Sequence, residues 1–315
     1  MISGIINVYK EKGFTSHDVV AKLRGILKQK KIGHTGTLDP DAEGVLPVCL
    51  GKATKVCDLL TDKDKEYEAV LLLGKVTDTQ DISGKALKES LVSCKEEEVR
   101  EIIAGFVGNY SQIPPMYSAL KVDGRKLCDL ARAGKEVERA PREVQIFSIE
   151  IIEIDLPRIR MRVHCSKGTY IRTLCHDIGE AAGCGGCMES LLRTRVADFR
   201  LQDARKLSEI EKQVQDVRAK EPQKELSKED LTGFLQDTDS VFRQYPCVSV
   251  KEEFIKPLYN GNPLKTHWLS EWQNEYQADL VRVYDSNQAF AGIYCWEGTR
   301  GCIRPVKVFM EPAPK

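Results

Sequence analysis

The sequence predicts an α+β protein followed by a small β domain, and three observations favour this class. Apolar residues recur at helical spacing in some segments and at every second position in others. From about Tyr245 the pattern changes to short β segments separated by turn sequences such as Asp-Ser-Asn and Glu-Gly-Thr-Arg-Gly. The chain of 315 residues also exceeds the usual length of one domain. We therefore expect a larger domain over residues 1–240 and a β domain over residues 245–315.

The first part of the larger domain shows alternating strand and helix signals. A helix is expected after Thr15 or Ser16, either of which can cap it, with apolar positions on one face. Ser93 followed by Glu96 resembles a capping box for a helix that runs through Ile103. The remaining expected elements are a strand at 5–8, a glycine-rich loop over 33–51, a helical stretch near 54–60, a strand at 67–73 and a turn-rich connection at 77–84.

The second part begins with a long excursion, residues 114–141, that contains one helical piece. It continues with expected strands at 144–154 and 158–164, a helix at 169–182 that ends at Gly183, and an acidic, solvent-facing helical segment at 207–239. In the second of these strands, Arg158, Arg160 and Arg162 alternate with apolar residues. This arginine row fits a phosphate track and a solvated face equally well. The β domain should contain strands at 280–284, 289–296 and 302–309.

The composition is typical of a soluble globular protein, with 42% hydrophobic and 30% charged residues. No apolar run approaches the ~18 residues of a membrane span, and the segment MISGIINVYKEKG lacks the pattern of a signal peptide. We therefore expect a cytoplasmic protein without a membrane partner. The eleven cysteines are odd in number and scattered through apolar sequence, which indicates reduced thiols rather than a disulfide framework.

The net charge carries no signal for nucleic-acid binding, because 47 basic and 47 acidic residues cancel. Their distribution is uneven. Residues 21–38 and 156–176 each hold five Lys or Arg and no acid, whereas residues 206–240 hold nine acids and six bases. Such a protein can bind a polyanion on one side, although each cluster alone is as well explained as a solvated face.

The stretch GHTGTLDPDAEGVLPVCLG, residues 33–51, fixes Asp39 before a proline among glycines and small residues. Glycine permits positive φ or close approach to a ligand, and proline biases Asp39 away from helix, so a shaped loop with one rigid acid is expected. An isolated Asp-Pro is more often a turn starter, but the length of this segment favours an active site. A phosphate loop is excluded because Leu46 and Pro47 break its pattern and Lys52 is followed by alanine.

One cysteine pair, Cys184-Gly-Gly-Cys187, invites a comparison with metal sites. With Cys175 and His176 it would supply four zinc ligands, but the spacing matches no paired zinc knuckle and no second pair exists. A glycine-rich turn at a helix end explains these residues better, and we expect no metal.

The remaining candidates suit chemistry on a nucleoside. Asp39 would act as nucleophile or base, Arg172 at a helix start would keep it ionised by lowering its pKa, and Tyr67 would stack on a base. The alternative for Tyr67 is an ordinary half-buried strand aromatic, and for His34 a turn residue.

Five stretches resemble the bacterial TruB family of tRNA pseudouridine synthases, in family order over roughly residues 1 to 200. They are GHTGTLDPDAEGVLPVCLGKATK, KEYEAVLLLGKVTDTQDISG, IPPMYSALKVDGRKLCDLARAGKEVER, HCSKGTYIRTLCHDIGEAAGCG and LLRTRVADF. The C-terminal segment with YNGNPL resembles the PUA-type RNA-binding domain of many members, less distinctively. The resemblance implies a pseudouridine synthase fold, with a mixed and largely antiparallel sheet flanked by helices and loops.

The resemblance also implies an activity: isomerisation of the uridine at position 55 in the T arm of tRNA to pseudouridine, by a monomer without metal or organic cofactor. Asp39 matches the catalytic aspartate, Arg172 its arginine partner, and Tyr67 the tyrosine that stacks on the base and takes the proton from C5. His34 would fill the space of the flipped uridine and Leu191 would line the pocket. Lys10 would support the amino-terminal motif, although Glu11 here follows it where the family commonly has proline. Further substrate contacts are expected at Gly36, Thr37, Tyr170, Arg160 and Lys126, the last two as grips on the T-arm backbone.

Two rival functions follow from the same residues. A non-catalytic RNA-binding or tRNA-folding protein would keep the scaffold, although retention of Asp39, Tyr67 and Arg172 together argues against lost activity. An aspartate-based phosphotransferase would need a second acidic cluster for magnesium. Asp62, Asp64 and Glu66 could form such a cluster, but they precede the strand that bears Tyr67 and fit a solvated turn better.

Overall fold

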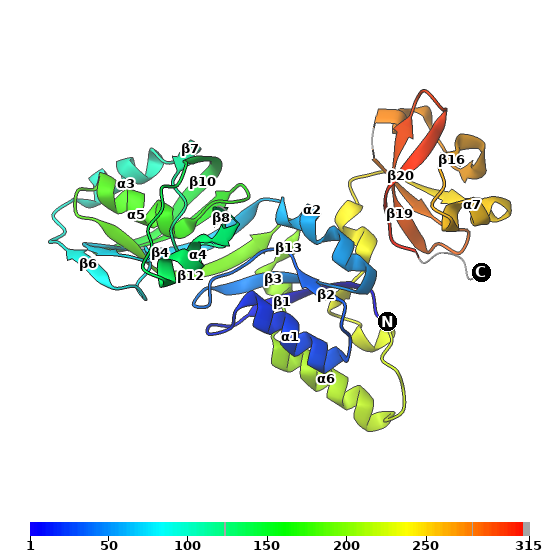
Figure 1. The fold of residues 1–315 in the computed structure, drawn as a ribbon, viewed down its shortest axis with the longest axis horizontal. Coiled ribbons are helices and arrows are strands. Elements are labelled where there is room, and N and C mark those ends of the chain that lie inside the picture. The colour runs from blue at the N-terminus through cyan, green and yellow to red at the C-terminus, as the bar shows by residue number, and fades with distance from the viewer. Residues whose placement is uncertain (123, 279, 311–315) are drawn as a thin grey trace.

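The computed structural model describes residues 1–122, 124–278 and 280–310. A ten-stranded sheet with helices packed on it forms the larger body, and a six-stranded sheet forms a second body that stands apart at the right of Figure 1. Within the described residues, β12 and β3 form the one parallel strand pair of the larger sheet, and its other pairs are antiparallel. The predicted α+β class with a mixed, largely antiparallel sheet is confirmed.

The larger sheet has the strand order β14-β1-β3-β12-β4-β11-β10-β7, with β2 pairing β3 and β13 pairing β12. Strands far apart in sequence therefore become neighbours at its centre. The strands are β1 (Gly4–Lys10), β2 (Ile32–His34), β3 (Glu43–Leu50), β4 (Lys65–Leu73), β7 (Gly108–Gln112), β10 (Arg142–Asp155), β11 (Arg158–Cys165), β12 (Gly186–Val196), β13 (Phe199–Arg200) and β14 (Leu235–Gln236).

The glycine-rich stretch is a loop only in its first half, so the expected loop over 33–51 was too long. Its second half is β3, in which every residue after Glu43 is buried. A short continuous apolar run flanked by glycines is consistent with a fully buried strand, and here β1 and β12 cover both edges of it. Burial of the second half leaves residues 35–42 as the loop that carries Asp39.

The larger body contains six α-helices within the described residues, and most of them pack on the sheet or on one another. They are α1 (Ser16–Leu27), α2 (Cys57–Thr61), α3 (Glu96–Ala104), α4 (Leu127–Arg132), α5 (Ile171–Ala181) and α6 (Leu207–Lys220). Thr15 caps α1 through a hydrogen bond that its hydroxyl accepts from the backbone N–H of Asp18, as predicted. Gly183, with φ of 75°, follows the end of α5, also as predicted.

Two helix predictions were wrong in detail. The capping residue of α3 is Lys95 rather than Ser93, because the Glu98 carboxylate accepts a hydrogen bond from the Lys95 backbone N–H at 2.9 Å. The acidic segment is helical only through Lys220, and it is not wholly solvent-facing. Apolar residues on one side of α6 are buried against α1, which stabilises this helix. The more polar residues that follow form short 3-10 turns and the two-residue strand β14.

The elements that position the candidate site belong to the core beneath α5. Cross-strand neighbours of β4, β11 and β12 alternate between two faces of the sheet, and the apolar face packs against α5 and α3. Two small hairpins project from this part: β5 (Lys75–Thr77) with β6 (Ala86–Glu89), and β8 (Lys121–Val122) with β9 (Arg125–Lys126). The second hairpin and α4 form the excursion predicted at 114–141.

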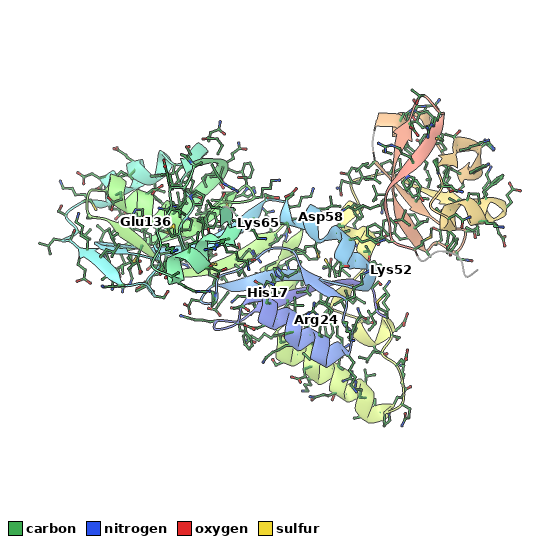
Figure 2. All side chains as sticks on the ribbon, viewed as in Figure 1. His17, Arg24, Lys52, Asp58, Lys65 and Glu136 are labelled. Atoms are coloured by element: carbon green, nitrogen blue, oxygen red, sulfur yellow. The ribbon has the colours of Figure 1, made fainter. Side chains whose placement is uncertain are left out.

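The second body contains the three strands expected near the C-terminus and three short additional ones. They are β15 (Cys247–Val250), β16 (Leu264–Lys265), β17 (Leu269–Ser270), β18 (Leu280–Tyr284), β19 (Phe290–Glu297) and β20 (Cys302–Val308), with helix α7 (Ile255–Tyr259). The rings of Phe242, Phe290 and Phe309 pack together between the two bodies. The Lys307 ammonium adds an ion pair to Asp58 of α2 at 2.6 Å, at the junction visible in Figure 2. No helix within the described residues is long and apolar enough to cross a membrane.

Candidate active site

The Asp39 loop is held at both ends by the body of the protein. Leu38 and Ala42 are buried, and the backbone N–H of Leu38 donates a hydrogen bond to the Ser16 hydroxyl at 2.9 Å. The Asp39 side chain between them remains 40% exposed. Anchoring the flanking residues while the carboxylate faces outward gives the rigid acid that the sequence predicted.

Gly44, directly after this loop, has a structural requirement of its own. Its φ is 105°, and a Cβ at this position would lie 2.2 Å from the carbonyl oxygen of Arg193 on β12. Only glycine permits both the backbone conformation and the close approach of β12. The loop is therefore fixed against the strand that carries Arg193.

Lys10 is the main internal support of the loop. Its side chain is completely buried, and its ammonium donates hydrogen bonds to the carbonyl oxygens of Ala42 at 2.6 Å, Pro40 at 3.0 Å and Glu11 at 3.2 Å. Burial lowers the pKa of Lys10 to about 8, although the nearby carboxylates of Glu43 and Asp39 oppose this shift. The glutamate that follows Lys10 takes part through its backbone carbonyl, so this arrangement does not require a proline at that position.

Arg172 reaches the loop from α5. Its guanidinium Nε lies 3.0 Å from one carboxylate oxygen of Asp39, and its Nη2 lies 3.3 Å from the other. The Arg172 side chain is only 6% exposed. Arg172 is therefore a buried charge at the start of α5. A two-point contact between guanidinium and carboxylate fixes the orientation of the carboxylate as well as its charge.

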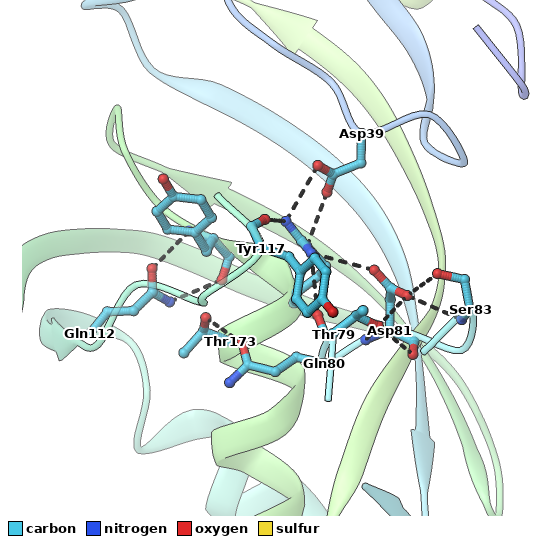
Figure 3. Close-up of polar contacts among 10 residues, drawn as sticks. Asp39, Thr79, Gln80, Asp81, Ser83, Gln112, Tyr117 and Thr173 are labelled. Carbon is cyan, nitrogen blue, oxygen red and sulfur yellow. Dashed lines mark hydrogen bonds and ion pairs between the residues drawn. The ribbon is translucent and has the colours of Figure 1, made fainter. Parts of the chain in front are cut away.

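Other oxygens complete the shell of Arg172, and Figure 3 labels the residues that supply them, among them Tyr117, Thr79 and Asp81. Its Nη2 donates to the Tyr117 carbonyl at 2.8 Å, and its Nη1 donates to the Thr79 carbonyl at 3.2 Å and lies 3.5 Å from the Asp81 carboxylate. Asp81 is itself held by the hydroxyls of Thr79 and Ser83. Arg172 thus joins the Asp39 loop, the turn after β5 and the excursion that begins at Pro114.

The pKa of Asp39 lies above its usual value. Partial burial of the carboxyl group raises the pKa, and the Arg172 guanidinium opposes this by lowering it. The Asp81 carboxylate raises the pKa of Asp39 further. The sequence analysis was therefore right that Arg172 lowers the pKa of Asp39, but the pKa as a whole is raised and not lowered.

Tyr67 lies on β4 between Val163 of β11 and Arg193 of β12 in the strand register. It is 9% exposed and belongs to the core cluster that also contains Leu38 and Ala42 of the loop. Burial raises the pKa of the Tyr67 phenol, while the neighbouring Arg193 guanidinium lowers it. The structure therefore brings Tyr67 beneath the Asp39 loop.

Three further predicted residues surround this centre. The ring of His34, at the end of β2, packs edge-on against His17 with 5.2 Å between ring centroids, and burial lowers its pKa so that neutral imidazole is favoured. Leu191 is partly buried against the same core as Tyr67. Tyr170 starts α5, where its backbone N–H donates to the Gln112 side-chain oxygen at 2.7 Å. Gly36 and Thr37 lie in the Asp39 loop, where Thr37 is exposed.

The two predicted RNA grips have different surroundings. Lys126 is exposed on β9 of the excursion hairpin. Arg160 is ion-paired with Glu68 at 2.6 Å, and Glu68 also binds Arg162 at 2.8 Å. Because Glu68 follows Tyr67 on β4, the arginine row shares the sheet face opposite to Tyr67. The row is therefore a solvent-facing set of ion pairs on the far side of the sheet.

The two alternative metal clusters are not assembled. Asp64 pairs with His164 and Arg195, Asp62 with Lys167, and Glu66 accepts a hydrogen bond from Thr194. Residues 183–186 form the turn between α5 and β12, with positive φ at Gly183 and Gly185. Within the part of the chain that the structure describes, no group of three or more His, Cys, Asp or Glu could hold a metal ion, and the cysteines form no disulfide.

Sequence reasoning missed three contributors to the site. Asp81 was assigned only to a turn, Tyr117 contributes a backbone carbonyl, and Arg193 lies in a stretch where only Leu191 was singled out. The signal available for Asp81 was its place in the dense polar run TDTQDISG. Arg193 gave no such signal, because Thr194 follows it directly and Arg195 lies two residues later.

Comparison with known proteins identifies the family of this chain. The family model for the N-terminal domain of TruB family pseudouridylate synthases matches residues 24–171, and that for the C-terminal domain of tRNA pseudouridylate synthase B matches residues 172–243. The chain is 53% identical to the tRNA pseudouridine synthase B of Lachnoclostridium phytofermentans, covering 98% of this chain and 100% of that one. It is 42% identical to that of Clostridium acetobutylicum, covering 93% and 95%.

Two solved structures share the fold over nearly the whole chain. One is a Cbf5-Nop10-Gar1 complex, with a TM-score of 0.71 and 28% identity, covering 99% of this chain and 87% of the other. The second is an H/ACA RNP bound to a substrate RNA containing 2′-deoxyuridine, with a TM-score of 0.70 and 25% identity, covering 98% and 86%.

Proposed function

This chain belongs to the TruB family of pseudouridylate synthases and isomerises uridine to pseudouridine in tRNA, and on that premise we propose that its target is the uridine at position 55 in the T arm. We assign the chemistry to Asp39, Tyr67 and Arg172. The observation that carries this assignment is the two-point contact of Arg172 with the half-exposed Asp39 carboxylate, directly above the buried strand that bears Tyr67.

The reaction needs few protein groups. The bond between C1′ and N1 breaks, the uracil rotates, a bond forms between C1′ and C5, and the hydrogen on C5 is lost while N1 gains one. No net oxidation or hydrolysis occurs, so one ionised carboxylate suffices at the sugar or base, as nucleophile or as general base. Burial raises the pKa of Asp39, and the Arg172 guanidinium opposes this shift and so favours the ionised carboxylate.

Access to the carboxylate requires the uridine to leave its stack, at a cost of a few kcal/mol. The neutral, half-buried ring of His34 is suited to occupy the space that the uridine vacates, because it can stack without bringing a charge into the RNA loop. Tyr67 supplies the aromatic surface for the extruded base and takes the proton from C5. Leu191 and Tyr170 line the same centre.

Binding of the T arm is assigned to the excursion and the β domain. The excursion is tied to the active site by the hydrogen bond from Arg172 to the Tyr117 carbonyl, and Lys126 on its hairpin is exposed. If RNA contacts the hairpin and shifts the excursion, the position of the Arg172 guanidinium would therefore change with it. The β domain over residues 245–315 is proposed to be a PUA-like RNA-binding domain, and the protein to act as a cytoplasmic monomer.

The direct test is incubation of the protein with a tRNA transcript, followed by chemical mapping specific for pseudouridine. We expect one modified position in the T loop, and none when the uridine there is replaced by cytidine. The protein carrying Asp39→Asn serves as the matched control. Modification at another position only would overturn the assignment of the substrate site, and retained activity of the variant would overturn the assignment of Asp39.

A further inference from the structure

Arg193 is a buried cation whose charge the mechanism above does not use. It is 1% exposed, and its Nε donates a hydrogen bond to the Val45 carbonyl of β3 at 2.7 Å. Its Nη2 is buried without a hydrogen-bond partner, and no acidic side chain among the described residues is ion-paired with it. A buried charge without a carboxylate partner costs several kcal/mol, so a stabilising or functional counterpart is expected.

The surroundings of Arg193 point to that counterpart. Arg193 is the register neighbour of Tyr67 across the β4 and β12 pair, and both residues are buried. Lys10, Lys65 and His34 are close enough for Arg193 to disfavour their charged forms. The neighbour that favours the charged form of Arg193 is the Tyr67 hydroxyl. Charged or ionisable groups on three elements act in turn on the pKa of Tyr67: Arg193 on β12 lowers it, whereas Cys165 on β11 and Asp39 in the loop raise it.

A tyrosine accepts a proton only as phenolate, and burial disfavours the phenolate. A guanidinium held next to the phenol oxygen opposes that effect, because opposite charges a few ångström apart stabilise each other strongly when water is excluded. Arginine is suited to this position because it keeps its proton even when buried. The Val45 carbonyl fixes the guanidinium plane, so it cannot swing away to solvent.

We propose that Arg193 is the positioning residue for Tyr67, orienting its oxygen toward the uracil and stabilising the phenolate that removes the proton from C5. The inference rests on the proposed role of Tyr67. In this step the bond between C5 and its hydrogen breaks, its electron pair re-forms the double bond between C5 and C6, and the proton goes to the Tyr67 oxygen. N1 takes a proton from solvent, and Tyr67 later returns its own proton to solvent. Arg193 remains charged throughout.

The first measurement is the alkaline titration of Tyr67 in the full-length protein without RNA. The ultraviolet spectrum of each protein minus that of its Tyr67→Phe counterpart isolates Tyr67 from the other tyrosines. We expect Tyr67 to ionise at higher pH in Arg193→Gln than in the parent, with about a tenfold or larger loss of phenolate at a fixed pH. Arg193→Lys should restore part of that loss, and Arg195→Gln on the same strand, which is ion-paired with Asp64 instead, should leave the titration unchanged.

The second measurement is release of tritium from C5 of the target uridine in a single turnover. Arg193→Gln should slow release about tenfold or more in the parent background and have little further effect in the Tyr67→Phe background. An unchanged Tyr67 titration, or equal slowing in both backgrounds, would show that Arg193 acts independently of Tyr67 and overturn the proposal. If Arg193→Gln does not fold, Arg193→Lys replaces it in both the Tyr67 titration and the tritium-release assay, and the same outcomes decide. Failure of the proposed function itself would be distinct, because the parent protein would then release no tritium.

Discussion

The Arg172 guanidinium contacts both oxygens of the Asp39 carboxylate, at 3.0 and 3.3 Å, from a helix that lies 133 residues later in the chain. The remaining nitrogen and the same Nη2 bind the Thr79 and Tyr117 carbonyls. The pair therefore does more than balance charge. It ties the acid to the turn after β5 and to the excursion that begins at Pro114, so the position of the carboxylate depends on both segments.

Replacing Asp39 by asparagine should reduce pseudouridine formation roughly a thousandfold or more, because the amide can act neither as nucleophile nor as base. Thermal unfolding and tRNA affinity should change little, since the Asp39 side chain is 40% exposed. Single-turnover assays by chemical mapping would measure the loss. Asp41→Asn, an exposed acid two residues later, is the matched control and should keep nearly full activity.

Replacing Arg172 by glutamine should lower the rate by about a hundredfold and change its pH dependence. Activity requires ionised Asp39, so the rate falls as the pH drops through the Asp39 pKa. Arg172 lowers that pKa, so its removal raises the pKa further, and the acid limb of the profile should move to higher pH. A profile that keeps its acid limb in place would contradict the role of Arg172 in ionising Asp39.

Replacing Lys10 by methionine should misplace the Asp39 loop. Three backbone carbonyls would lose a charged donor inside the protein, and we expect the free energy of unfolding to decrease by about 1–3 kcal/mol. The rate at saturating tRNA should fall more than the affinity for tRNA. Lys12→Met, at an exposed position nearby, should change neither quantity, which denaturant titration and single-turnover kinetics can check.

Charge reversal at Lys126 should weaken tRNA binding, and the slope of log affinity against log salt should fall by about one or more. Arg160→Glu should have a smaller effect, because Arg160 lies on the sheet face opposite to Tyr67 and is paired with Glu68. Filter binding at several salt concentrations separates the two variants. A larger effect of Arg160 would place RNA on the arginine row and contradict the assignment made from the structure.

Removal of divalent metal should leave the chemical step intact, because the proposed mechanism uses only protein side chains. The assay is best made with an isolated T-arm stem-loop in excess chelator, since the folding of whole tRNA depends on magnesium. Loss of activity on this short substrate would instead support a metal-dependent reaction. The acids at 62, 64 and 66 would then be the residues to substitute first.

Much of the fold could be predicted because the buried residues of its helices and strands recur at regular spacing in the sequence. The alternation along residues 158–164 correctly gave β11, and the apolar spacing after Thr15 gave α1 together with its cap. Prediction failed where one local sequence pattern is compatible with two different structures. The apolar run after Glu43 fits a loop edge as well as a strand, and only the neighbours β1 and β12 decide that it is buried.

By itself the sequence determined the secondary structure of most of the chain and, through its long motifs, the family and the choice of Asp39, Tyr67 and Arg172. Tertiary structure alone decided the partners of these residues: Asp81 and Tyr117 at Arg172, Lys10 beneath the loop, and Glu68 beside the arginine row. It also turned Arg193, one basic residue among many in the sequence, into a buried cation next to Tyr67. The reason is physical, because secondary structure follows from near neighbours in sequence, whereas burial and charge pairing depend on segments that meet only when the sheet is assembled.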